Sequence, residues 1–284
     1  MEKSSMFTVT PMSQQVEIDP GDSCEGDIIL TNPLNASGDF DYKVELSSYN
    51  VVGDDYNADF LTVTEHSQIV NWITIDNPTG TLKPNESVKV HYKINVPEKA
   101  VAGGQYAAFL VSSAGDEAPI SGIAVSNVFE MASILYVQVS GDIIRKGEML
   151  GAEVPGFVTS TPIKVTSSFK NEGSLHEPAY ISLEARSYFS STPVYPKAGE
   201  SGVLEEIIMP GTTRTVTREI DGVSSLGIYD VTQTISYMDE VKTIRQVVIA
   251  CPIWFMLLSF LTIVAVVLAI IVSVKRHKSK KQVF

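Results

Sequence analysis

The residues best spaced to bind a metal are Asp55, Asn57 and Asp59, which have the D-x-N-x-D spacing of a calcium-binding loop. Carboxylate and amide oxygens at alternate positions are the hard ligands that Ca²⁺ prefers. The remainder of the pattern is missing, because Phe60 stands where the loop needs a glycine and His66 where it needs a bidentate glutamate. We therefore treat these three residues as a calcium candidate, with a solvated acidic loop as the alternative.

Side chains that could catalyse a reaction are few and scattered. The four histidines are His66, His91, His176 and His277, and none has another histidine or a cysteine at metal-ligand spacing. The sequence has no Gly-x-Ser-x-Gly elbow, no phosphate-binding glycine loop before a helix and no His-Glu-x-x-His motif. We expect a protein that is not an enzyme and that carries no cofactor.

The charge distribution argues against nucleic acid as a partner. Five of the 21 Lys and Arg residues lie after residue 274, whereas all 33 Asp and Glu residues precede residue 247, so the body of the chain is strongly acidic. Binding to phosphates needs a basic face. The two cysteines, Cys24 and Cys251, lie in different parts of the chain and are not expected to pair. The folded parts must therefore be stabilised by ordinary hydrophobic cores.

An uncharged apolar run extends from Val247 to Val274, which is long enough to cross a lipid bilayer as a helix. The basic residues that follow it, in a tail of residues 275–284, predict that this end stays in the cytoplasm. Residues 1–246 are then extracellular, on a single-pass membrane protein. The first 15 residues contain no apolar segment. We expect that a signal peptide was removed before Met1, with a tail-anchored protein as the alternative.

The chain before the apolar run has the pattern of short β-strands separated by turns. The clearest strand is 88–96, in which Val88, Val90 and Tyr92 alternate with lysine and histidine, as expected of a strand with one buried and one wet face. Similar segments, among them residues 40–46, 69–75 and 227–237, recur with turn signals every 8–12 residues and no convincing helix, which is typical of β-sandwiches. We predict a first domain over residues 1–140, a second over 141–246 and a transmembrane helix over 247–274.

The two predicted domains share a skeleton of turn residues. Each has an asparagine turn after an early strand (Asn32-Pro33; Asn171-Glu172-Gly173), a proline before an alternating strand (Pro84; Pro210) and a Gly-x-Tyr that opens a late strand (Gly104-Gln105-Tyr106; Gly227-Ile228-Tyr229). A tyrosine at the start of a late strand resembles the tyrosine corner of immunoglobulin-like sandwiches. The fold that we predict is all-β, with two tandem immunoglobulin-like β-sandwiches followed by one transmembrane α-helix.

These turn and strand signatures resemble the WxL-interacting surface proteins of Gram-positive bacteria. The segments that carry the resemblance are residues 7–11, 19–21, 29–32, 82–87, 95–97 and 102–106 in the first domain, with residues 171–173, 208–211 and 227–231 in the second. A terminal membrane helix with a basic tail fits the same pattern. The resemblance implies a first domain associated with peptidoglycan and a second domain that binds a WxL-type surface protein. It transfers no individual binding residue.

The function that we expect is that of a membrane-anchored cell-surface protein that attaches to cell-wall peptidoglycan, to a surface-protein partner, or to both. Candidate contact residues are tyrosines beside two loops, Tyr49, Tyr56, Tyr188 and Tyr195, since exposed aromatic rings can stack on sugars or anchor a protein partner. The alternative is a surface adhesin or structural scaffold that binds host or neighbouring cells.

Overall fold

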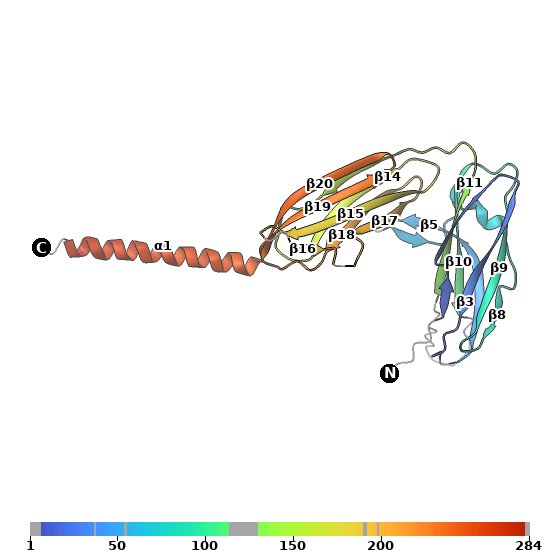
Figure 1. Ribbon diagram of the computed structural model, residues 1–284, viewed down its shortest axis with the longest axis horizontal. Helices are drawn as coiled ribbons and strands as arrows, with labels where there is room; N and C mark the ends of the chain where they lie inside the picture. Colours follow the sequence, from blue (N-terminus) through green and yellow to red (C-terminus); the bar gives the residue numbers. More distant parts are fainter. Residues whose placement is uncertain are drawn as a thin grey trace. The chain divides into compact units, whose positions relative to one another are not determined.

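The computed structural model describes residues 7–36, 38–53, 56–113, 130–189, 192–197 and 199–281. The chain divides into two compact units, and the first includes Lys170–Glu177 and Ile208–Arg214 in addition to Met1–Gly147. The domain limit drawn from the sequence at residue 140 stays a prediction. Most of the described chain is β-strand, and one long helix follows the strands (Figure 1).

Strands β1 to β11, here called the first sandwich, form two sheets and a small hairpin. One sheet has the order β1 (Thr8–Thr10), β3 (Ser23–Thr31), β9 (Ser87–Asn95) and β7 (Ile73–Ile75). The other has the order β2 (Ser13–Ile18), β11 (Glu130–Val139), β10 (Gly103–Ser113), β4 (Phe40–Ser48) and β8 (Thr79–Leu82). The hairpin consists of β5 (Asn50–Val52) and β6 (Asn57–Asp59). One hydrophobic core is shared by residues from both sheets, so the two sheets pack face to face.

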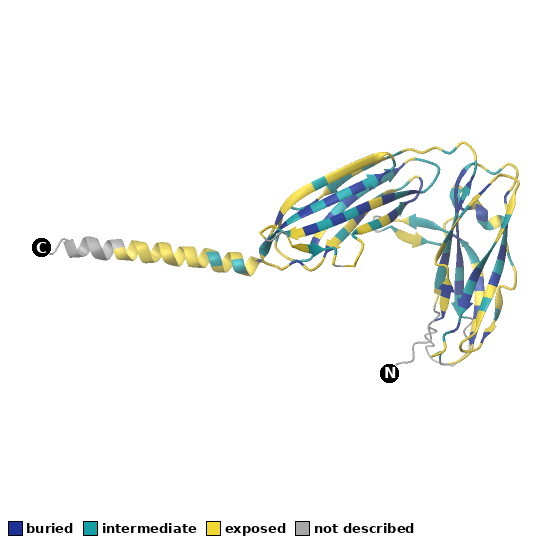
Figure 2. Cartoon of the chain, viewed as in Figure 1, coloured by how far each residue is buried: buried dark blue, intermediate teal, exposed yellow. Residues whose placement is uncertain are grey.

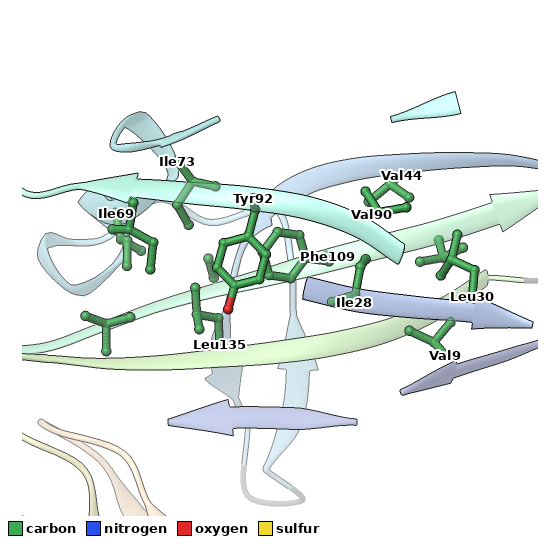
Figure 3. Packing of buried hydrophobic residues seen from close by; sticks show 14 of the residues in the cluster. Val9, Ile28, Leu30, Val44, Ile69, Ile73, Val90, Tyr92, Phe109 and Leu135 are labelled. Atoms are coloured by element: carbon green, nitrogen blue, oxygen red, sulfur yellow. The ribbon is translucent and has the colours of Figure 1, made fainter. Parts of the chain in front are cut away.

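The core of the first sandwich follows from the alternation in its strands. Ile28 and Val90 are register partners on β3 and β9 and are both buried. Across the sandwich, the ring of Tyr92 lies against that of Phe109 on β10, with centroids 4.7 Å apart (Figure 3). The opposite, wet face of the same two strands carries mostly polar and charged partners, among them Asp27 opposite His91. The register predicted for residues 88–96 is confirmed.

Strands β12 to β20, the second sandwich, repeat this arrangement. One sheet has the order β12 (Gly147–Glu153), β14 (Ile163–Asn171) and β18 (Thr213–Ile220). The other has the order β13 (Phe157–Val158), β20 (Glu240–Ala250), β19 (Gly227–Tyr237), β15 (Glu177–Ser187) and β16 (Pro193–Tyr195), with β17 (Val203–Ile208) also paired to β15. The rings of Phe169 and Tyr237 meet between the two sheets, at 5.2 Å between centroids.

The repeated skeleton has the same structural basis in both sandwiches. In each, an opening strand pairs within one sheet (β1 with β3, β12 with β14) and a following short strand runs parallel to the last strand of the other sheet (β2 with β11, β13 with β20). The buried Asn32 side chain donates to the carbonyl oxygen of Leu82, and the buried Asn171 side chain donates to that of Ile208. Both acceptors lie two residues before the matching prolines. The immunoglobulin-like β-sandwich prediction therefore agrees with the strand order.

Two expectations for local structure are wrong. Residues 69–75 were expected to form one strand, but Glu65–Asn71 is a short 3₁₀-helix, η1, and only Ile73–Ile75 is strand. Thr64 caps η1, because its hydroxyl accepts from the His66 backbone N–H while Ser67 reaches back to the Thr64 N–H. The tyrosine corner holds only at Tyr229, whose hydroxyl bonds to the Ser224 backbone.

The C-terminal helix α1 extends from Ile253 to Lys281. Its segment Ile253–Ser273 is 21 residues long, has a mean hydropathy of 3.1 and is by length and composition able to cross a membrane. The predicted start at Val247 is wrong, because Val247–Ala250 belong to β20, where Val248 and Ala250 are buried in the sandwich. The helix also continues beyond residue 274, into the segment expected to be a separate tail.

Candidate functional site

Two of the three residues proposed for calcium lie in the described part of the chain, and the site stays a prediction. Asp55 lies outside the described residues, while Asn57 and Asp59 are on β6. The Asp59 carboxylate accepts hydrogen bonds from the backbone N–H groups of Leu61 (2.9 Å) and Thr62 (3.3 Å), and hydrogen bonding lowers its pKa. In the described part of the chain, no three His, Cys, Asp or Glu side chains are grouped so that they could hold a metal ion. The observed role of Asp59 is to cap its own loop.

The histidine His91 belongs to an ion pair on the strand surface. His91 is on the wet face of β9, with its Nδ1 atom 2.9 Å from Asp27, and this contact raises the pKa of His91 and lowers that of Asp27. Cys24 and Cys251 are both free, as expected.

Of the four candidate tyrosines, only Tyr188 is exposed. Its ring stands edge-on to Phe189, which was not singled out from the sequence.

The most exposed long strand of the described chain is β20. From Glu240 to Val247 every residue except Ile244 is exposed (Figure 2). One edge of β20 pairs along its whole length with β19. On its other edge β13 pairs with Ile249 and Ala250 alone. Within the described residues, the outer edge of β20 is therefore unpaired before Ile249.

The corresponding strand of the first sandwich is protected. There β2 pairs with β11 over six register positions, from Ile134 to Val139. In the second sandwich the matching strand β13 has only two residues. Because β13 runs parallel to β20, residues 148–153 are those in line with residues 240–245, and they belong to β12 in the other sheet. A segment of β20 about as long as a typical strand is left open as a consequence.

The direction of the free backbone groups on β20 follows from the ladder. The N–H groups of Ile249 and Cys251 donate outward to Gly156 and Val158. Since outward and inward groups alternate along a strand, the N–H and C=O groups of Val241, Thr243, Arg245 and Val247 point to the same open edge. The Val247 carbonyl oxygen accepts 3.1 Å from the Gln246 side-chain amide, a local substitute for a neighbouring strand.

The side chains along this edge combine apolar and charged groups. Val241 is 68% exposed, and Val247 and Ile249 are also exposed. Arg245 donates to the Asp230 carboxylate on β19, with Nε 2.9 Å from Oδ1, and this bond lowers the pKa of Asp230. Beside this pair, Glu184 and Arg186 of β15 form a second ion pair and help to line a shallow pocket of about 240 Å³.

The other long edge strands of the described chain are less suited to pairing with a partner strand. β12 and β18, each of at least seven residues, also end a sheet. The exposed side chains of β18 are threonines and Glu219, with no apolar group among them. β12 contains two glycines, which weaken a strand as a pairing surface. The open edge of β20, Glu240–Val247, is therefore the best candidate interaction site. No sequence pattern marks it, because the exposure of an edge depends on which strands pair.

Comparison with known proteins gives no family. No family model matches the chain, and no curated protein matches it. Similar solved structures include a chain from the chaperone–tip adhesin complex of CFA/I fimbriae, at 8% identity and a TM-score of 0.41 (87% of this chain, 100% of that chain). Others are the chaperone DraB of E. coli, at 12% identity and 0.38 (85% and 97%), and a chain from the CsuC–CsuE chaperone–tip adhesion subunit complex of Acinetobacter baumannii, at 12% and 0.40 (85% and 98%). At these values the similarities carry no inference about the function of this chain.

Proposed function

We propose that this chain is a non-catalytic, membrane-anchored surface protein that binds a protein partner by accepting a strand at the open edge of β20. An edge strand with free N–H and C=O groups is a template for another strand. Strand addition obtains its affinity from backbone hydrogen bonds and its specificity from alternate side chains. The single observation that carries the proposal is the unpaired edge from Glu240 to Val247, exposed on both faces.

The side chains of the edge indicate what kind of segment it would accept. Val241 and Val247 favour an extended strand with apolar residues at matching positions. The ion pairs at Arg245 and Arg186 lie on the outer face of the same sheet. A charged residue of the partner, whether acidic or basic, would find a group of opposite charge there. We infer a protein segment as partner. The resemblance to WxL-interacting proteins would make it a WxL-type surface protein.

The helix α1 supplies the anchor in this proposal. Its 21-residue apolar segment matches a hydrocarbon core of about 30 Å, since 21 residues at about 1.5 Å per residue span about 32 Å. The five basic residues after residue 274 favour a cytoplasmic C-terminus and an extracellular body.

A test can separate backbone pairing from side-chain contact at one position. Thr243→Pro removes an outward N–H without removing a bond to β19, whereas Thr243→Ala keeps the N–H and removes the side chain. A photo-crosslinking residue at Val241, on the surface of intact cells that produce the protein, should yield one adduct with a secreted protein. Thr243→Pro should abolish that adduct and Thr243→Ala should retain it, with thermal unfolding unchanged. An adduct that survives Thr243→Pro would refute strand addition.

Attachment of residues 1–140 to peptidoglycan stays a prediction, and among the described residues of this segment no surface feature favours it. It is tested by sedimenting the detergent-solubilised full chain with purified peptidoglycan at moderate salt. Retention in the pellet would support wall attachment. If the chain stays in solution, the protein partner is the remaining function, and cell-binding assays decide between a surface partner and the adhesin alternative.

A further inference from the structure

The end of the second sandwich from which the chain enters α1 is made by several segments distant in sequence. Phe157 pairs with Ile249, and Ala250 pairs with Gly227. Ser187, at the end of β15, pairs with Tyr229. The loops after β13, after β15 and before β19 therefore share one end of the sheet with the last residues of β20. We call this end the helix-proximal end.

Apolar side chains at the helix-proximal end are exposed. Phe189 is 80% exposed, and Phe157, Tyr188, Leu226 and Ile249 each have more than two fifths of their surface exposed. Several of them line a groove of about 400 Å³ that also includes Ala250 and Cys251, and none of the lining residues is charged. Large exposed apolar groups gathered at one site mark an interaction surface.

The sequence of these segments carries an independent signal. Residues 154–163, 187–196 and 222–229 contain no charged residue, and neither do residues 246–252. The described parts of these segments approach the same end of the sandwich. At the chain's average of 19% charged residues, the three loop segments would hold about five such residues if they resembled an ordinary soluble surface. Charge is thus missing from these loops, while charged residues flank them, among them Lys164 and Asp221.

Chain connectivity restricts where this end can lie. Only Cys251 and Pro252 separate β20 from α1. With about 3.8 Å between consecutive Cα atoms, Ala250 lies no further than about 11 Å from Ile253. The apolar segment Ile253–Ser273 has no spare length, because its span of about 32 Å is used by a hydrocarbon core of about 30 Å. If the segment crosses a membrane, the last residues of β20 are held at the headgroup layer.

We propose that the helix-proximal end is a lipid-binding surface, on which Phe157, Tyr188, Phe189 and Leu226 lie in the headgroup layer of the bilayer that α1 crosses. The proposal rests on the membrane anchor of the proposed function and is independent of the partner site on β20. Aromatic rings are favoured at the membrane interface, where an apolar body and a polar atom are both accommodated. The missing charges avoid the cost of desolvation at this depth.

The test uses single-tryptophan forms of the full chain in phosphatidylcholine vesicles, with or without bromine on the acyl chains. Trp72→Phe leaves Trp254 as the reporter of the helix. Adding Trp254→Phe and Phe189→Trp places the reporter on the helix-proximal end. The matched control is Val241→Trp, also on an exposed residue, at the opposite end of β20 and about 30 Å away at about 3.3 Å per residue.

We expect brominated lipid to quench Trp254 and the Phe189→Trp reporter to a similar extent and to leave the Val241→Trp control unchanged. Quenching of Trp254 without quenching at position 189 would overturn the lipid-binding surface and leave the anchor standing. Absence of quenching at Trp254 would overturn both. A reporter at position 189 that is shifted to the blue but unquenched, and that responds to protein density, would show a second copy of the chain there and also refute the proposal. Leu226→Trp repeats the measurement from a different loop.

Discussion

The buried amide of Asn32 should fix one end of the first sandwich. Its Nδ2 atom donates to the carbonyl oxygens of Leu82 (2.9 Å) and Gly38 (3.0 Å), and the residue is only 3% exposed. Asn32 follows β3 in one sheet, whereas Leu82 ends β8 in the other. The side chain therefore joins the two sheets where no strand pairing does so. We predict that Asn32→Ala destabilises the first sandwich.

The size of the effect can be worked from these bonds. Each hydrogen bond contributes about 0.5–1.5 kcal/mol net, and buried acceptors left without a donor increase the loss, so Asn32→Ala should cost about 2 kcal/mol. For a domain of the size of the first sandwich, this loss of stability corresponds to a fall in Tm of about 8 °C. Asn171 makes the same bond to Ile208, donates also to Leu175 and accepts from the Gly173 N–H. With one more bond, Asn171→Ala should cost about 3 kcal/mol.

The assay is thermal unfolding of the full chain in detergent, followed by circular dichroism. The matched control is Thr31→Ala, which removes an exposed hydrogen bond to Ser87 from the neighbouring residue and should change Tm little. Asn32→Asp sharpens the test, because it puts a buried carboxylate against two carbonyl oxygens. Asn32→Asp should lower Tm more than Asn32→Ala at neutral pH, and its Tm should rise again when the pH is lowered and the carboxylate is protonated. If Asn32→Ala unfolds at the same temperature as Thr31→Ala, the reasoning is wrong.

Two further predictions concern the tyrosine corner and the charged face of β9. Tyr229→Phe removes both bonds to the Ser224 backbone and should cost about 2 kcal/mol in thermal unfolding, whereas Tyr180→Phe on an exposed residue should cost almost nothing. Because Asp27 raises the pKa of His91, protonated His91 stabilises the fold below its ordinary pKa of about 6.5, and this contribution is lost as pH rises through the raised value. His91→Asn should therefore lower Tm more at about pH 5.5 than at about pH 8, and an equal loss at both would contradict the assigned pairing.

The strands that sequence predicts well are those with one wet face. In β9 a one-residue slip would bury Lys89 and Lys93, so alternation fixes the register. The same holds for β4 and β19, whose predicted positions agree with the structure. The asparagine turns and the Gly-x-Tyr motifs were also informative, because a Cβ on Gly227 would lie 2.7 Å from the Tyr229 hydroxyl. Glycine at that position is a packing requirement.

The elements that were missed are those whose conformation is decided by distant partners. β2 and β13 are short strands that exist because they run parallel to β11 and β20. The apolar residues Ile69 and Ile73 predict a strand, but a capping box at Thr64 starts a helical turn, η1, there. The apolar run from Val247 predicts one helix, although its first residues complete β20. Hydropathy does not distinguish a buried strand from a membrane helix over so few residues.

The open edge and the helix-proximal end lie on the same strand, and this has a consequence for the partner. From Ala250 back to Val241 is nine residues, or about 30 Å at about 3.3 Å per residue. If the helix-proximal end rests on lipid, a strand added to β20 is held within roughly 40 Å of the bilayer, whatever the orientation of the first sandwich. The two proposals make opposite demands on Val241 and Phe189: the first must stay accessible to a protein while the second contacts lipid. Crosslinking at position 241 and quenching at position 189, measured on the same reconstituted chain, therefore test whether one strand serves both roles.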